Sequence, residues 1–240
     1  MKPVSLISTS VIILIVAASA SFAHIINPET GLKFRYNAEL VEVSPVIDGV
    51  LNDTPWHETG IPGKMDQEVV YDQKWLESSD FTGVFAGVWR SGFLYIAVQM
   101  SDDQVENHGT KLSEKDHLVV YLDPDHSGHK SDLYRYDLPV GDDEHQSFDP
   151  PLRAVAWGDD GQSCELMFNL GDIAEKGNTV GFWIYYNDVD NGNLEHRISW
   201  GPPGYTDDDL SLPDLVFTAK LKPNVNQKVL QWGRIKSFYY

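Results

Sequence analysis

The stretch FTGVFAGVWRSGFLYIAVQMS, residues 81–101, decides the fold class. Within it, residues 84–89 and 94–99 alternate between two sets of side chains rich in β-branched and aromatic types. An alternation with a period of two residues is typical of a β-strand. The dipeptide Ser91-Gly92 between the two runs indicates a tight hairpin turn. The sequence therefore predicts two strands, Phe81–Arg90 and Leu94–Ser101, paired as a hairpin.

Outward from this hairpin, similar short runs alternate with Gly, Pro, Asp and Asn, and no convincing helical stretch occurs. Many short strands separated by turns at regular spacing indicate a sandwich or a barrel. We therefore predict an all-β fold, an antiparallel β-sandwich forming one domain over residues 24–240. The other expected strands are Glu39–Ser44, His117–Leu122, Leu133–Pro139, Arg153–Trp157, Cys164–Leu170, Val180–Asn187, Leu194–Trp200 and Leu215–Lys220.

The composition excludes some classes of protein. The formal net charge is −18, which argues against a nucleic-acid-binding face. A hydrophobic share of 42% with 22% charged residues is typical of a globular chain. The single cysteine, Cys164, lies in an apolar run, so we expect an inert core residue.

The first 23 residues have the features of a signal peptide. Lys2 precedes the apolar run Val11–Ala18, and Ser19–Ala23 is a small-residue cleavage signature. The apolar run is shorter than the ~20 residues of a membrane-spanning helix, so we expect cleavage and no transmembrane anchor. The mature protein would be secreted or periplasmic. Cleavage would leave His24 at the N-terminus, where copper chelation is a weaker alternative to a frayed end.

The C-terminal segment differs from the rest of the chain. No acidic residue follows Asp214, while Lys and Arg recur up to position 236. Residues 222–240 form a basic C-terminal extension with two interpretations. It docks onto a partner protein or an acidic surface, or it is one more strand covering an acidic sheet, which we favour.

The run VIDGVLNDTPW, residues 46–56, resembles the first motif of family 9 carbohydrate-binding modules in the wider DOMON-like superfamily. It reads as an edge strand, a tight Asp-Gly turn and a Trp that closes one end of the core. The resemblance runs from about residue 40 to 221. The further matches, in order, are Val88–Arg90, Leu94–Ile96, Lys115–Asp123, Tyr134–Tyr136, Cys164–Leu166, Gly181–Ile184, Asn187–Asp188 and Arg197–Trp200.

This resemblance implies a secreted, non-catalytic module that accompanies glycoside hydrolases in polysaccharide catabolism. Such modules hold a sugar between aromatic rings, hydrogen-bond it with charged side chains and bind structural calcium. The sequence also departs from the family pattern. Ser113 stands where the family has a Trp, Val119 where it has a Glu, and Tyr205 is the only aromatic residue in the loop where it has a second Trp. The two family arginines match at Arg135 and Arg197.

The candidate ligand-binding residues follow from these matches. Arg135 and Arg197 lie on expected strands, where an arginine is costly unless it is paired. Two interpretations stay open: the guanidinium groups bind ligand hydroxyls or carboxylates, or they form ion pairs with Glu165 or Asp188. Three aromatic residues at strand ends beside loops are candidates for a ligand platform, namely Trp157, Trp200 and Tyr205.

One loop has the composition of a calcium site. Asp123, Asp125, Ser127 and Asp132 place oxygen ligands around Gly128, although the spacing is not that of an EF-hand. Together with the resemblance, this favours structural calcium over a solvated turn. The segment Asp188–Asn193 is a second candidate, and its Asn-Gly step favours a plain hairpin turn.

Two rival functions remain in view. Some DOMON-like relatives bind haem b through a Met with a His or Lys, and the candidate methionines here are Met65, Met100 and Met167. Alternatively, the sugar site has decayed and the chain is an envelope interaction protein. No nucleophile or metalloprotease motif is present, so we do not expect an enzyme.

Overall fold

The computed structural model describes residues 33–60, 62–68, 81–142, 149–201, 204–205 and 210–220. Nearly all regular structure in these residues is β. The elements are β1 (Arg35–Leu40), α1 (Thr54–Glu58), β2 (Gly63–Met65), β3 (Gln67–Glu68), β4 (Phe81–Arg90), β5 (Phe93–Asp102), η1 (Leu112–Glu114), β6 (His117–Asp123), η2 (Lys130–Asp132), β7 (Tyr134–Pro139), β8 (Leu152–Trp157), β9 (Ser163–Asn169), η3 (Gly171–Ile173), β10 (Thr179–Asp190), β11 (Asn193–Ser199), β12 (Gly204–Tyr205), β13 (Leu210–Ser211) and β14 (Asp214–Thr218).

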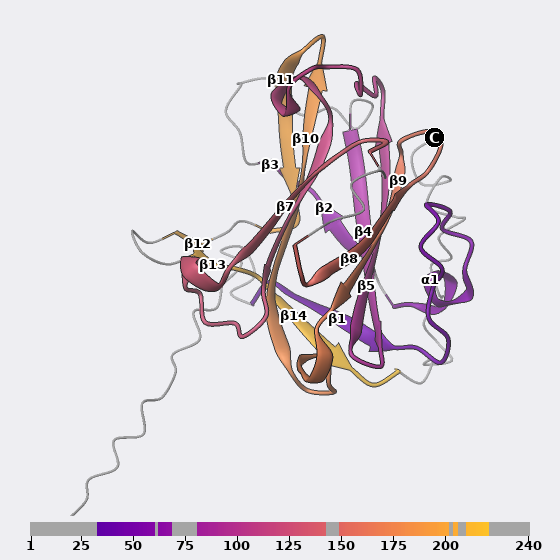
Figure 1. Ribbon diagram of the computed structural model, residues 1–240, viewed down its shortest axis with the longest axis vertical. Coiled ribbons are helices and arrows are strands. Elements are labelled where there is room, and N and C mark those ends of the chain that lie inside the picture. Colours follow the sequence, from indigo (N-terminus) through magenta and orange to yellow (C-terminus); the bar gives the residue numbers. More distant parts are fainter. Residues whose placement is uncertain are drawn as a thin grey trace, which may run out of the picture.

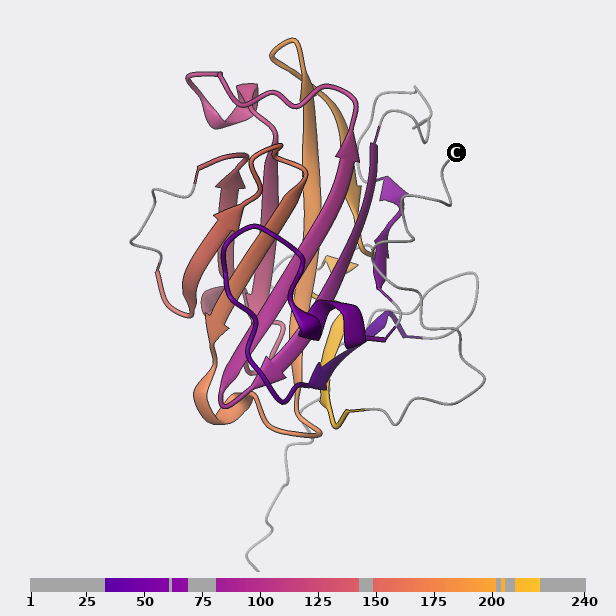
Figure 2. The ribbon, with the colours of Figure 1, turned by 90° about the vertical axis from the view of Figure 1, so that its right-hand side faces the viewer.

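The strands form two layers that are joined by the long strand β10 (Figures 1 and 2). One layer has the order β7-β6-β10-β11-β3, and the other has the order β14-β1-β4-β5-β9-β8 with β2 on β4. Residues 179–181 of β10 pair with β14, whereas residues 181–187 pair with β6. The sheet therefore curls over on itself, and the predicted β-sandwich is confirmed.

The main core lies between the two layers. Alternate residues of the first layer point into it, among them Leu118 and Val120 of β6 and Phe182 and Ile184 of β10. Alternate residues of the second layer meet them, including Phe85 of β4. The residues between these positions face outward, because successive side chains of a strand point to opposite faces.

The hairpin that we took as the starting point is confirmed. β4 and β5 pair from Phe81 with Asp102 to Arg90 with Phe93. Both turn residues have positive φ, 50° at Ser91 and 84° at Gly92, as expected for a two-residue hairpin turn. Cys164 is fully buried in the core, also as expected.

Two details of the N-terminal region differ from the prediction. The expected strand Glu39–Ser44 ends at Leu40, and β1 begins earlier and runs parallel to both β14 and β4. Residues 46–50 form no strand, and the motif continues instead into the five-residue helix α1.

A buried carboxylate explains the irregular path of this motif. The Oε2 atom of Glu165 accepts hydrogen bonds from the backbone N–H groups of Asp48 and Gly49, at 3.0 and 2.8 Å. Its Oε1 atom accepts from Trp56 Nε1 at 2.7 Å. Because these donors point at Glu165, they are not available to a neighbouring strand. Trp56 thus closes a second apolar cluster on the outer face of β4 and β5, rather than one end of the main core.

Several expectations lie outside the described residues. These are the signal peptide 1–23, the N-terminal His24 and the basic extension 222–240. Within the described part of the chain, no helix has the length and apolar character required to cross a bilayer.

Candidate functional site

The outer face of β7, β6, β10 and β11 carries the polar and aromatic side chains that we regard as the candidate site. Cross-strand pairing arranges them in three rows that run from strand to strand. Because residues two apart on a strand share a face, all three rows lie on the side opposite the main core. The rows are Arg135–Tyr121–Trp183, Asp137–Val119–Tyr185–Ser199 and Pro139–His117–Asn187–Arg197.

Aromatic rings make the floor of this face. Trp183 and Tyr185 are buried, with ring centroids 4.6 Å apart, and they pack with Val119. The ring of Tyr121 lies 5.5 Å from that of Trp183 and is half-buried. The guanidinium of Arg135 lies 5.6 Å from the Tyr121 ring centroid, and that of Arg197 lies 5.0 Å from the Tyr185 ring centroid. Cation–π contact therefore holds both guanidinium groups against the floor.

The two arginines are held laterally by different partners. Asp137 Oδ1 accepts hydrogen bonds from Arg135 Nε and Nη2, at 3.3 and 2.7 Å. This pair is open to solvent, since half of the Arg135 side chain is exposed. Arg197 instead donates from Nε to the amide oxygen of Asn187, at 2.6 Å.

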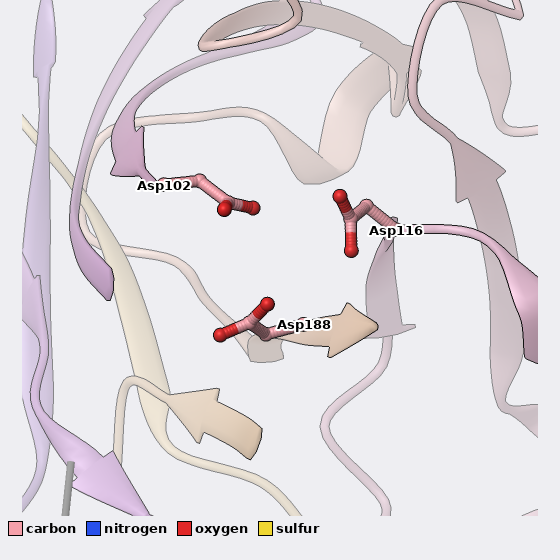
Figure 3. A group of neighbouring side chains, drawn as sticks. All are labelled: Asp102, Asp116 and Asp188. Atoms are coloured by element: carbon pink, nitrogen blue, oxygen red, sulfur yellow. The ribbon is translucent and has the colours of Figure 1, made fainter. Parts of the chain in front are cut away.

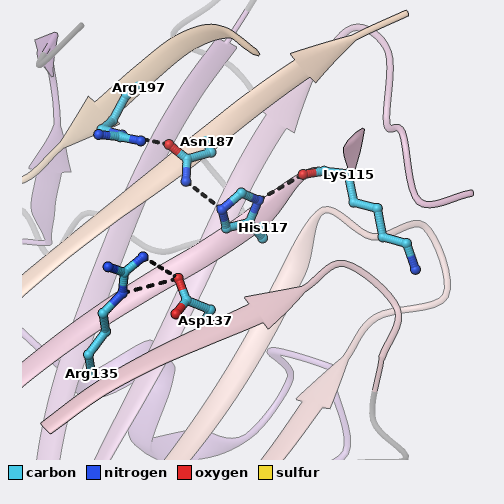
Figure 4. Close-up of polar contacts among 6 residues, drawn as sticks. All are labelled: Lys115, His117, Arg135, Asp137, Asn187 and Arg197. Carbon is cyan, nitrogen blue, oxygen red and sulfur yellow. Dashed lines mark hydrogen bonds and ion pairs between the residues drawn. The ribbon is translucent and has the colours of Figure 1, made fainter. Parts of the chain in front are cut away.

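The contact of Arg197 continues into a chain of hydrogen bonds (Figure 4). The amide group of Asn187 donates to Nε2 of His117 at 2.6 Å, because an NH₂ group can only donate. Nε2 is then an acceptor, so the proton of the neutral imidazole is on Nδ1, which donates to the Lys115 carbonyl at 2.7 Å. Burial lowers the pKa of His117 and favours this neutral form.

The structure thus brings the two predicted arginines onto one face. Within the described residues, the two arginines contact Asp137 and Asn187 rather than Glu165 or Asp188. The carboxylate partner of Arg135 is Asp137, and Glu165 is engaged by the 46–56 motif. The β10 alternation places Asp188 one residue out of phase with Asn187, on the opposite face.

The structure buries two of the three residues of the predicted aromatic platform. Trp200 is 7% exposed and packs in the main core, 5.1 Å from the ring of Phe85. Trp157 is 5% exposed and belongs to the same core. Trp157 ends β8 and Trp200 directly follows β11, and both side chains lie in the main core. Tyr205 lies in β12, and its side chain is outside the described part.

Three buried carboxylates meet on the inner side of the sheet, a group that the sequence did not reveal (Figure 3). Asp102 ends β5, Asp116 precedes β6, and Asp188 lies on β10. One oxygen of each lies within 4.8 Å of the others, and the residues are 6%, 0% and 3% exposed. We call this group the Asp triad. Asp116 and Asp188 fall in two of the runs that resemble the family, and this was the only feature of the sequence that pointed to the group.

Backbone and side-chain donors orient the Asp triad. Val189 N–H donates to Asp116 Oδ1 at 2.7 Å, and Tyr186 Oη donates to Asp102 Oδ2 at 2.9 Å. Burial raises the pKa of Asp116 to about 7, and the neighbouring Asp102 carboxylate adds to this shift. Buried carboxylates crowded together without a cation favour a protonated form, whereas a divalent cation would stabilise the ionised form. Carboxylate oxygens are the ligands that calcium prefers, so the donor set fits calcium.

The predicted calcium loop has a different arrangement. Asp123 is 1% exposed; its Oδ2 accepts from Gly128 N–H at 2.8 Å, and the pKa of Asp123 is raised to about 6 by burial and by the adjacent Asp125. Asp125 Oδ1 accepts from the backbone N–H of Ser127 at 3.2 Å. Asp125 and Asp132 line an open cavity of about 340 Å³. The Asp triad is the one close group of three acidic, His or Cys residues found within the described ranges, so calcium at the loop stays a prediction.

The other candidates from the sequence also have a place in the structure. Asn191 and Gly192 form the β10–β11 hairpin turn with positive φ, as expected for the segment 188–193. Met65 and Met100, the candidate haem ligands, are each 3% exposed in the main core. Met167 packs beside the second cluster.

The fold is that of a β-sandwich domain, and its outer face carries a group of polar and aromatic side chains. The model of the carbohydrate family 9 binding domain-like family matches residues 47–208, and the chain belongs to this family. The search of curated proteins found no match. The resemblance to family 9 modules is thereby confirmed, and such a module is a binding domain rather than a catalytic one.

Solved structures show the same fold. A family 9 carbohydrate-binding module from Caldicellulosiruptor kristjanssonii in complex with glucose has a TM-score of 0.59 and 17% identity, covering 80% of this chain and 100% of that one. Its complex with cellotriose has a TM-score of 0.59 and 16% identity, covering 80% of this chain and 98% of that one.

Proposed function

We propose that this chain binds a carbohydrate on the outer face of β7, β6, β10 and β11. The observation that carries the proposal is the pair of guanidinium groups, Arg135 and Arg197, each resting on a tyrosine ring of that face. The family, and the glucose and cellotriose complexes of the structural relative, support a carbohydrate as the ligand class.

The geometry assigns a role to each part of the face. Arginine side chains present several N–H donors in a fixed plane, which suits the closely spaced oxygens of a sugar. Asp137 offers its second carboxylate oxygen as an acceptor for a hydroxyl, because both hydrogen bonds from Arg135 go to Oδ1. The half-buried ring of Tyr121 supplies an apolar surface for stacking.

The departures from the family pattern agree with this arrangement. Val119 replaces the family glutamate and is fully buried between the rings. The carboxylate of Asp137 lies on the adjacent strand directly opposite Val119. We infer that Asp137 supplies the acidic group of the site from β7 in place of β6. Ser113 lies in η1, and Tyr205 remains a candidate for ring stacking.

The Asp triad would hold a structural calcium ion. Asp102, Asp116 and Asp188 join the ends of three strands from both layers, so a cation there would tie the layers together. The carboxylate ligands of the Asp triad support this proposal. The triad would be a second calcium site besides the loop predicted at Asp123, Asp125, Ser127 and Asp132.

The cellular setting follows from the binding role. We infer a secreted or periplasmic protein that serves glycoside hydrolases by holding polysaccharide or oligosaccharide, with the basic extension 222–240 available to a partner protein. The haem and copper alternatives, and an interaction protein without a sugar site, remain rivals. An absorbance spectrum and metal analysis of the purified protein would identify haem or copper directly.

Binding to a broad glycan array with calcium present tests the proposed function. We expect a defined set of bound glycans. Arg135→Ala and Arg197→Ala should each lose this binding and keep the wild-type melting temperature, while Arg153→Ala, at an exposed position on β8, serves as the matched control. A blank array with folded protein would contradict the proposal, and unfolding of both variants would show that the arginines are structural.

A further inference from the structure

The two arginines of the proposed site differ in how their charge is balanced. Arg135 has the Asp137 carboxylate at 2.7 Å. Arg197 is in contact with the amide oxygen of Asn187 and the ring of Tyr185, and both of these groups are neutral. Within the described part of the chain, no carboxylate pairs with Arg197, so its positive charge is not neutralised there.

The orientation of Arg197 is fixed by buried neighbours. Its Nε atom is engaged by Asn187, which is 2% exposed and is itself held by His117, 6% exposed. The tyrosine ring below fixes the plane of the guanidinium. With Nε engaged, the donors that the described residues leave for a ligand are the N–H groups of Nη1 and Nη2, which form a planar fork. Such a fork matches the two oxygens of a carboxylate.

The charges of the three rows leave a local positive excess. Among their described side chains, the charged ones are Arg135, Asp137 and Arg197, and His117 is neutral in the tautomer fixed above. The whole chain carries a net charge of −18. The overall field of such a chain repels anions, so an anion bound on this face would be held by the local positive excess at Arg197.

We propose that the ligand of this face is an acidic sugar, and that the C6 carboxylate of a uronic acid residue accepts two hydrogen bonds from the Nη atoms of Arg197. This inference rests on the proposed carbohydrate-binding function and names the ligand class. A uronic acid and its neutral hexose share the same ring and differ at C6. Stacking on Tyr121 is therefore common to both, and Arg197 distinguishes them.

Titration calorimetry with paired ligands tests the inference. The probes are oligogalacturonate, oligoglucuronate and alginate oligosaccharides, each compared with its carboxyl-reduced neutral form. We expect at least one acidic form to bind about tenfold more tightly than its neutral partner, or better. The preference should shrink as the salt concentration rises from about 50 to about 500 mM, because salt screens the charge pair.

Variants identify the residue that recognises the carboxylate of the ligand. Arg197→Gln should reduce the ratio of acidic to neutral affinity to about one. Tyr121→Leu is the matched control; it removes the stacking ring that both forms share, so it should weaken both forms and keep the ratio. Arg197→Lys retains the charge without the fork and should keep a smaller preference, which provides a second test where Arg197→Gln does not fold.

The outcomes separate the two proposals. Equal or tighter binding of the neutral forms would overturn the acidic-sugar inference and leave the carbohydrate site in place. A preference that survives Arg197→Gln would also overturn it, since another group would then recognise the carboxylate. No binding of either form by folded wild-type protein, together with a blank glycan array, would contradict the proposed function itself.

Discussion

Trp56 and Glu165 are joined by a buried hydrogen bond of 2.7 Å across 109 positions of sequence. The same carboxylate accepts from the backbone of Asp48 and Gly49. Glu165 thus replaces the strand pairing that the 46–56 segment lacks. Gly49 reinforces the arrangement, since its φ is +81° and a Cβ there would lie 2.3 Å from the carbonyl oxygen of Trp157.

The first prediction concerns this anchor. In Glu165→Gln one carboxylate oxygen becomes an NH₂ donor facing another donor, and we expect a loss of about 2–3 kcal/mol in the free energy of unfolding. Urea denaturation followed by tryptophan fluorescence measures it. The exposed Glu175→Gln is the control and should change stability by less than about 0.5 kcal/mol. Similar midpoints for both variants would show that Glu165 is not an anchor.

The second prediction concerns the hydrogen-bond chain behind Arg197. Asn187→Leu removes the acceptor of Arg197 Nε and the donor to His117, so the guanidinium loses its fixed orientation. We expect sugar affinity to fall about tenfold, in the range of one hydrogen bond to a charged group. Calorimetric titration of the array-selected glycan measures this. Asn193→Leu, at an exposed position on β11, should bind like wild type, and equal affinity for both variants would contradict the positioning role.

The third prediction concerns calcium removal. If calcium binds the Asp triad, saturating it at about 100 times its dissociation constant stabilises the fold by about 2.7 kcal/mol. A chelator should therefore lower the melting temperature, and Asp116→Asn should remove the response. Asp125→Asn should keep it. The reverse pattern, with Asp125→Asn insensitive to the chelator and Asp116→Asn sensitive, would place the ion at the predicted loop.

The fourth prediction concerns pH in the presence of chelator. The pKa of Asp116 is raised to about 7 by burial, above its unfolded value, so the folded state holds the proton more tightly. Its contribution to stability is complete below about pH 4 and is lost as the pH rises towards about 7. We expect the calcium-free protein to be about 2–3 kcal/mol less stable at pH 7.5 than at pH 5 through this group. Asp116→Asn should flatten that part of the profile, and an unchanged profile would exclude Asp116 as its source.

The fifth prediction concerns Trp200. Because this side chain packs against Tyr36, Phe85 and Phe182, Trp200→Ala should cost about 3–5 kcal/mol of stability. Tyr134→Ala, with 40% of its surface exposed, is the comparison and should be nearly neutral. Thermal melts distinguish a core role of Trp200 from a role in a ligand platform. A Trp200 variant that melts like wild type while losing sugar binding would restore the platform hypothesis.

The local sequence pattern was sufficient to predict most of the strands. The alternation of residues 84–89 and the turn at Ser91-Gly92 predicted β4 and β5 because both signals are properties of neighbouring residues. The irregular 46–56 segment could not be predicted in the same way. Its path depends on Glu165, which the sequence presents only as one acid in an apolar strand.

The sequence by itself determined the all-β fold and the presence of Arg135 and Arg197 on strands, because periodicity and residue type act locally. Only the tertiary structure decided what these residues contact. The pairing of β6 with β7 and β10 sets Arg135 on Tyr121 and aligns His117 with Asn187. The closing of one layer over the other brings Asp102 to Asp116 and turns Trp200 inward. Such contacts depend on the register between distant strands, and the spacing of residues along the chain does not encode that register directly.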